Sequence, residues 1–187
     1  MGPGKLRVLV LCTANVCRSP VTAMLLDRAL VERGVDGVVR SAGFLVEDEP
    51  ACPAMTQFGR ERGIDLGGHR SRVVSADDVA ESTLILTMER RHARELMMQF
   101  DIGHDKVFTL GSFAPAVLRS PPSGEGLEEW LARMIEQRQA MDFLGSGASD
   151  EVGDPHGESR RVHRKTFEWL EQLALSTADA LVALHRL

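Results

Sequence analysis

Short apolar runs alternate with amphipathic stretches along this chain, and clusters of glycine, proline and serine separate them. Four of the runs have the length and the Val, Leu and Ile content of buried strands, at residues 6–11, 38–41, 83–87 and 106–110. Continuous apolar runs of this kind are typical of parallel strands that helices cover on both faces. The pattern therefore predicts an α/β fold with three layers, α/β/α, around a parallel sheet.

Helices are predicted over the amphipathic stretches. The first should begin at Ser19 and Pro20, because serine is a good N-cap and proline suits the first helical position, and it should end at Gly34. Further helices are expected over residues 53–62, 89–99 and 158–185. No internal repeat or linker divides the sequence, so we expect residues 1–187 to form a single domain.

One segment, at about residues 115–150, exceeds what a minimal fold of this kind needs. Stretches rich in glycine and serine, at 120–126 and 145–149, bracket an amphipathic helix. Its apolar positions follow helical spacing: Leu127, Trp130, Leu131, Met134, Ile135 and Met141. We expect an inserted helical segment that serves either as extra cover for the core or as a lid edge or dimer contact.

Composition narrows the function. A net charge of -5 argues against general nucleic-acid binding. No apolar run approaches the ~20 residues that cross a bilayer, and the first residues, Met-Gly-Pro-Gly-Lys, do not resemble a secretion signal. Three cysteines without metal-ligand spacing fit reactive thiols in a reducing compartment. We therefore expect a cytoplasmic protein without membrane, metal or other cofactor, and leave its oligomeric state open.

Cys12 and Arg18 stand at the two ends of a loop between the first strand and the first helix. Such a loop can surround a phosphate group, because its N–H groups turn inward, the helix start adds positive potential and the arginine closes the far side. The same influences favour the thiolate form of a cysteine, and the hydroxyl of Ser19 can donate to it. The expected phosphate-binding residues are Thr13, Ala14, Asn15, Val16, Cys17, Arg18 and Ser19.

The arrangement predicts a phosphate-ester hydrolase in which Cys12 attacks phosphorus and water later hydrolyses a cysteinyl-phosphate. The plainer alternative is a small buried cysteine at the end of a strand. An alkoxide leaving group needs a proton, and Asp154 is the best candidate for a general acid because Pro155 restricts its backbone on the loop before the last helix. An Asx turn before proline explains Asp154 equally well.

These residues resemble the low-molecular-weight protein tyrosine phosphatases. The family pattern C-x-G-N-x-C-R-S-P appears here as C-T-A-N-V-C-R-S-P at residues 12–20. The resemblance continues through residues 41–43, 63–72, 84–88 and 154–155, and covers nearly the whole chain outside 115–150. It implies a four-stranded parallel sheet with the phosphate-binding loop between the first strand and the first helix. It also implies a phosphatase for a phosphotyrosine-containing protein or a small aryl phosphate.

Roles follow from the resemblance. Cys12 is similar to the nucleophile, Arg18 to the transition-state clamp and Asp154 to the general acid. Asn15 resembles the residue that holds the loop in strained geometry, and the supporting network maps onto Ser19, Ser41 and His69. Cys17 resembles a second loop cysteine that can form a disulfide with the nucleophile under oxidation, and the alternative is an inert thiol. Cys52 has no partner in this scheme, and we expect it to be structural.

The chain departs from the family pattern in its substrate walls. Aromatic residues usually follow Asp-Pro, whereas His156 and Gly157 stand there. Phe44 and Leu45 are expected to line the other wall, although core packing explains Phe44 as well. The loss of aromatic residues on one wall weakens the expectation of a strict phosphotyrosine preference.

Two departures lie in the loop. Ala14 replaces a glycine, which would cost roughly 1 kcal/mol if the position required a positive φ. Val16 stands where protein arginine phosphatases of this fold tend to carry threonine, so phosphotyrosine or another aryl phosphate is the expected substrate.

Two other functions remain open. A thiol-dependent arsenate reductase of the same fold needs two further cysteines near the end of the third strand, and residues 83–92 contain none. Reduction coupled to a small external thiol is not affected by this argument. A non-enzymatic phosphate-binding module would not require a nucleophile.

Overall fold

The computed structural model describes residues 5–144 and 149–185, so the first residues and most of the stretch 145–149 lie outside the described part. Its centre is a four-stranded sheet in the order β2-β1-β3-β4, and every strand pairs with its neighbour in parallel. The strands are β1 (Leu6–Leu11), β2 (Gly37–Ala42), β3 (Leu84–Thr87) and β4 (Val107–Thr109). The expected four-stranded parallel sheet is confirmed.

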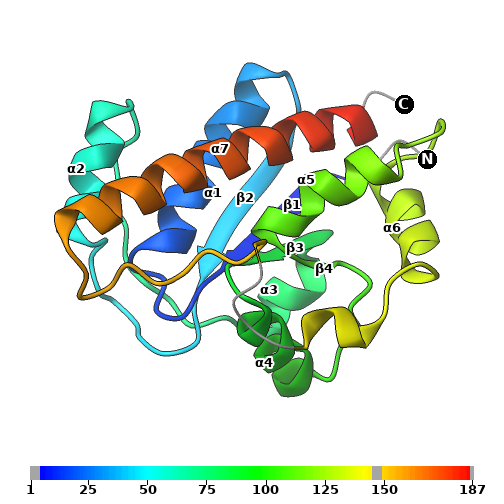
Figure 1. Cartoon of the computed structure of the whole chain (residues 1–187), viewed down its shortest axis with the longest axis horizontal. Coiled ribbons are helices and arrows are strands. Elements are labelled where there is room, and N and C mark those ends of the chain that lie inside the picture. Colours follow the sequence, from blue (N-terminus) through cyan, green and yellow to red (C-terminus); the bar gives the residue numbers. More distant parts are fainter. Residues whose placement is uncertain (1–4, 145–148, 186–187) are drawn as a thin grey trace.

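Helices cover both faces of this sheet, as Figure 1 shows. The larger layer contains α1 (Arg18–Glu32), α2 (Pro53–Glu61), α5 (Leu110–Arg119), α6 (Leu127–Ile135) and α7 (Arg160–His185). The other contains α3 (Ala76–Glu81), α4 (Arg90–Phe100) and a short 3-10 helix, Ala140–Phe143. The three-layer architecture is therefore confirmed.

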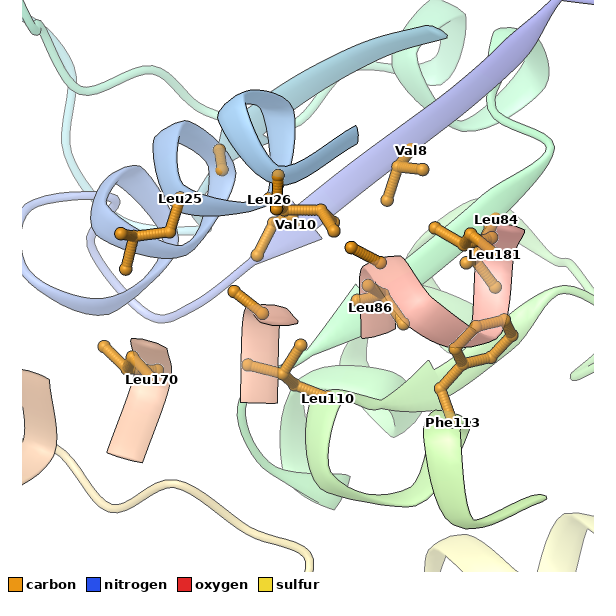
Figure 2. Packing of buried hydrophobic residues seen from close by; sticks show 14 of the residues in the cluster. Val8, Val10, Leu25, Leu26, Leu84, Leu86, Leu110, Phe113, Leu170 and Leu181 are labelled. Atoms are coloured by element: carbon orange, nitrogen blue, oxygen red, sulfur yellow. The ribbon is translucent and has the colours of Figure 1, made fainter. Parts of the chain in front are cut away.

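The protein has two hydrophobic cores, one on each face of the sheet, and side chains that alternate along the strands contribute to both. On β1, Val8 and Val10 face the larger layer, where they pack against residues of α1 and α7 (Figure 2). Leu9 and Leu11 face the opposite side and join Leu96 of α4. Because both faces of β1 are buried, the sequence run has no polar alternation except at Arg7.

The inserted segment differs from its expected form. The helix α6 ends at Ile135, and Met141 lies in the separate 3-10 helix with 68% of its surface exposed. Periodicity alone extends an apolar stripe across this break. Trp130 is fully buried against the rings of Phe108 and Phe113, which also contact each other. Its indole N–H donates to the carbonyl of Ser120 at 2.7 Å. These contacts make α6 a cover for the core.

Two helices were not expected from the sequence. The helix α3 is only 6 residues long and begins with a capping box between Ser75 and Asp78. The helix α5 follows β4 without a connecting residue, and Pro115 inside it weakens the helical signal. Among the described residues, no helix has the length and apolar character needed to cross a membrane.

Candidate active site

The loop between β1 and α1 brings a thiol to the start of a helix. Cys12 is 2% exposed, and its Sγ lies 3.0 Å from the hydroxyl oxygen of Ser19. The helix begins at Arg18, so the expectation that Ser19 is its N-cap is wrong. The hydroxyl of Ser19 instead turns into the loop, where it also accepts a hydrogen bond from the Asn15 side chain at 2.9 Å.

Asn15 connects the loop to three neighbouring segments. It is fully buried with φ 54°, a left-handed conformation that asparagine tolerates better than most residues. Its Nδ2 donates to the hydroxyls of Ser19 and Ser41, both at 2.9 Å, and its Oδ1 accepts the N–H of Arg72 at 3.1 Å. Its carbonyl accepts a hydrogen bond from His69 Nε2 at 2.7 Å. The structure thus brings together the residues expected to support the loop.

The strand β2 approaches the loop so closely that only glycine fits after it. A Cβ on Gly43 would lie 2.7 Å from the Asn15 nitrogen and 2.8 Å from the Thr13 carbonyl oxygen. The next residue, Phe44, donates its N–H to that same carbonyl at 2.7 Å. Ala14 does not have a positive φ, so the condition under which it would be strained is not met.

Arg18 is 1% exposed, and its guanidinium lies between two carboxylates. One terminal nitrogen donates to Glu89 at 2.5 Å and to the carbonyl of Val152 at 2.9 Å. The other donates to Asp154 at 2.6 Å and to the hydroxyl of Thr13 at 3.1 Å. Its buried Nε has no hydrogen-bond partner in the described part of the chain. Arg18 thus has one buried donor left for a further acceptor.

Glu89, the residue that precedes α4, was not expected from the sequence. Burial raises the pKa of Glu89, but hydrogen bonds from Arg91 and Arg18 outweigh it and lower that pKa to about 2. The carboxylate is therefore ionised throughout the neutral range and fixes the orientation of Arg18. Arg91 also donates to the hydroxyl of Thr13 at 2.8 Å, so the two arginines share this acceptor.

His92 is a second residue that the sequence did not reveal. Its Nδ1 accepts the N–H of Glu89 at 3.2 Å, so the proton resides on Nε2, which donates to Thr13 at 2.9 Å. Burial lowers the pKa of His92 to about 3, and the ring is neutral at ordinary pH. It stacks on Phe44 with centroids 5.9 Å apart. The one signal for both residues is their position just beyond β3, where the carboxyl ends of parallel strands converge.

Asp154 forms an Asx turn and also contacts Arg18. Its Oδ1 accepts the N–H of His156 at 3.1 Å, which is the Asx turn, while its Oδ2 faces Arg18. The side chain is 36% exposed, so it sits at the surface end of the site. Of the expected substrate walls, Phe44 is half-buried against His92, whereas Leu45 and His156 are exposed.

The other two cysteines lie next to each other. Cys17 and Cys52 are both buried free thiols, and the backbone N–H of Cys52 donates to the carbonyl of Val16 at 3.0 Å. Cys52 was expected to lack a partner, but it has a neighbouring thiol in the loop.

Comparisons with known proteins point to one family and one fold. The model of the low molecular weight phosphotyrosine protein phosphatase family matches residues 7–122. A protein-arginine-phosphatase of Geobacillus stearothermophilus is 28% identical over 176 residues, which cover 94% of this chain and 95% of the relative. The low molecular weight protein-tyrosine-phosphatase Wzb of Salmonella typhi is 29% identical over 179 residues, 95% of each chain. A solved structure of a low molecular weight protein tyrosine phosphatase from T. tengcongensis is similar with a TM-score of 0.71 at 28% identity, covering 94% of this chain and 99% of its own.

Proposed function

Because the chain belongs to the low molecular weight phosphotyrosine protein phosphatase family, we propose that it hydrolyses aryl phosphate monoesters, phosphotyrosine among them, through a cysteinyl-phosphate on Cys12. The observation that carries the proposal is the convergence at one loop of the Cys12 thiol, the buried Arg18 guanidinium and the Asp154 carboxylate. A phosphate held against the loop N–H groups and Arg18 lies in reach of a nucleophile on one side and an acid on the other.

The first step transfers the phosphoryl group to sulfur. The Sγ–P bond forms while the bond between phosphorus and the phenolic oxygen breaks, and Asp154 gives its proton to the departing oxygen. Ser19, 3.0 Å from Sγ, stabilises the thiolate by donating to it. Charge on the phosphoryl oxygens is met by Arg18 and by the backbone N–H groups of the loop.

The contact between Arg18 and Asp154, at 2.6 Å, places the carboxyl group next to the guanidinium that would bind the phosphate. Glu89 and the carbonyl of Val152 hold the other terminal nitrogen, so the guanidinium keeps its orientation when a phosphate binds.

The second step returns the enzyme to its starting state. Water attacks phosphorus, Asp154 takes a proton from that water, the P–O bond forms and the Sγ–P bond breaks. The products are inorganic phosphate and the thiolate of Cys12.

Val16 bears on the substrate class. One relative is named a protein-arginine-phosphatase, and enzymes of that kind tend to carry a threonine at the position of Val16. Valine offers no hydroxyl to a polar guanidino group, so an aromatic leaving group fits this loop better. Phe44, half-buried beside the loop, supplies one apolar surface for an aromatic ring.

Turnover of p-nitrophenyl phosphate in EDTA tests the mechanism, with Cys12→Ser and Asp154→Asn beside the wild type. We expect turnover by the wild type, none by Cys12→Ser, and a smaller loss for Asp154→Asn because nitrophenolate leaves without much help from an acid. Rapid quenching should trap a phosphorylated wild-type chain. Turnover that survives in Cys12→Ser would refute the nucleophile.

Matched peptides test the substrate class. A phosphotyrosine peptide and a phosphoarginine peptide of the same sequence should be dephosphorylated at different rates. The wild type should prefer the phosphotyrosine peptide, and Val16→Thr should show a smaller preference for it. Preference of the wild type for phosphoarginine would contradict the proposal. A reduced wild-type enzyme that turns over neither ester but reduces arsenate with an external thiol would favour the arsenate reductase alternative.

A further inference from the structure

Three side chains with metal-ligating atoms meet beside the catalytic loop, on the residues that precede α1 and α2 and in the first turn of α7. They are Cys17, Cys52 and His163, and their ligating atoms all lie within 4.8 Å of one another. The three residues are 5%, 9% and 9% exposed. They are far apart in the sequence, so no motif reveals them.

A hydrogen bond fixes the tautomer of the histidine. Its Nδ1 lies 3.1 Å from the carbonyl oxygen of Ser159, which can only accept, so Nδ1 carries the proton. The lone pair is therefore on Nε2. Metal-binding histidines are commonly fixed in this way, by a hydrogen bond from the other ring nitrogen to a backbone carbonyl.

The backbone holds the two cysteines close together. The N–H of Cys52 donates to the carbonyl of Val16, the residue before Cys17, at 3.0 Å. This contact places both thiols at the same point, where α1 and α2 begin.

We propose that Cys17, Cys52 and His163 form a site for one thiophilic divalent cation of the Zn²⁺ class, with water as the fourth ligand. Two thiolates and an imidazole suit zinc and exclude calcium and magnesium, which need oxygen ligands. The bound ion would tie the catalytic loop to α2 and α7. This site is independent of the proposed phosphatase activity, because none of the three ligand side chains has a part in that mechanism.

A simple redox pair of Cys17 and Cys52 is the competing interpretation. A disulfide would use the two sulfurs but would not need a buried imidazole with its lone pair free. The third side chain and its fixed tautomer favour the metal.

The test uses the Cys12→Ser chain, which removes the catalytic thiol as a competing ligand and leaves only Cys17 and Cys52. Reduced protein is titrated with Co²⁺, followed by absorption, and then with Zn²⁺ in competition with a chromophoric chelator. We expect one Co²⁺ per chain with a thiolate charge-transfer band, displaced by one Zn²⁺. Adding Cys17→Ser or Cys52→Ser should abolish the band, and adding His163→Gln should weaken Zn²⁺ binding by ~10-fold or more.

His185→Gln, at the other end of the same helix, is the matched control and should leave binding unchanged. Circular dichroism establishes that each variant is folded. A further measurement uses a folded chain in which all three ligands are intact, where Zn²⁺ should slow the alkylation of both thiols. The proposal is overturned if no Co²⁺ band appears, if His163→Gln binds Zn²⁺ as well as its parent, or if Zn²⁺ leaves alkylation unchanged. It is equally overturned if an oxidant such as diamide joins the two thiols in a chain that binds neither ion.

Discussion

Replacing Glu89 by glutamine tests how far the site depends on the ion pair behind Arg18. The substitution keeps the size of the side chain and removes its charge. Glu89 is 19% exposed and bonded to a guanidinium that is 1% exposed, so solvent screens this pair weakly. Arg18 would retain Asp154 as its remaining carboxylate partner.

The pKa of Glu89 sets the magnitude. It falls from an ordinary value of 4.5 to about 2, and at ~1.4 kcal/mol for each tenfold change this is worth about 3 kcal/mol of folding free energy. Because the pKa is lower in the folded state, the contribution is complete above the unfolded value of 4.5 and disappears as the pH falls through about 2. At about pH 3, less than half should remain.

Urea unfolding of the wild type and Glu89→Gln, at about pH 7 and about pH 3, measures this directly. We expect Glu89→Gln to cost ~2–3 kcal/mol at the higher pH and clearly less at the lower one. Glu32→Gln is the matched control, because Glu32 is 60% exposed and lies 3.7 Å from Arg28, so it should cost less than ~0.5 kcal/mol. A loss below ~1 kcal/mol for Glu89→Gln at about pH 7, or one that does not change with pH, would show that this ion pair does not stabilise the fold as its pKa implies.

Three further substitutions probe other parts of the structure. His92→Phe removes the hydrogen bond to Thr13, and steady-state kinetics should give a roughly tenfold lower kcat/KM. The same variant tests the stability of the fold at low pH. Because burial lowers the pKa of His92 to about 3, the wild-type stability should fall as the pH drops below the unfolded value of 6.5, and that of the variant should fall less. Gly43→Ala places a methyl 2.7 Å from a loop nitrogen and should cost ~1–3 kcal/mol in thermal unfolding, whereas Gly68→Ala, with open space around it, should be nearly neutral. Trp130→Ala should cost ~3–5 kcal/mol without lowering kcat of the folded enzyme, and a parallel loss of kcat would contradict its role as core cover.

The residues that the sequence revealed lie in one continuous motif or beside a proline. Cys12 and Arg18 belong to a single loop between a strand and a helix, and Asp154 is marked by the proline that follows it. Glu89 and His92 carry no such local sign. They reach Arg18 and Thr13 because β3 pairs with β1 and delivers its carboxyl end beside the loop. Sequence spacing cannot give that contact before the strand order is known.

Helix boundaries show a similar limit. Ser19 and Pro20 predict a helix start two residues late, at Pro20 instead of Arg18, because the Ser19 hydroxyl has a use other than capping. Local propensity predicts that Ser19 caps the helix, but its hydroxyl instead accepts the hydrogen bond from Asn15. The added helix was expected to reach Met141 because the spacing of apolar residues continues past Ile135. That spacing contains no sign that the helix ends at Ile135.

The acid loop returns to the site through contacts that the inserted segment does not supply. Asp150 accepts hydrogen bonds from Thr109, the last residue of β4, at 2.6 Å and from Arg90, the first residue of α4, at 3.0 Å. Its backbone also packs so tightly on α5 that a Cβ on Gly111 would lie 2.6 Å from the Asp150 carbonyl oxygen. The chain is thus fixed to the sheet before it reaches Asp154.

Val152 completes this connection. Its N–H donates to the carbonyl of Met88, just after β3, at 2.8 Å, and its own carbonyl accepts from Arg18 at 2.9 Å. The position of Asp154, two residues on, follows from these strand-end contacts, whatever the length of the segment between α5 and Asp150. An insertion at this point can therefore lengthen and cover the core while the distance between the acid and Arg18 stays the same.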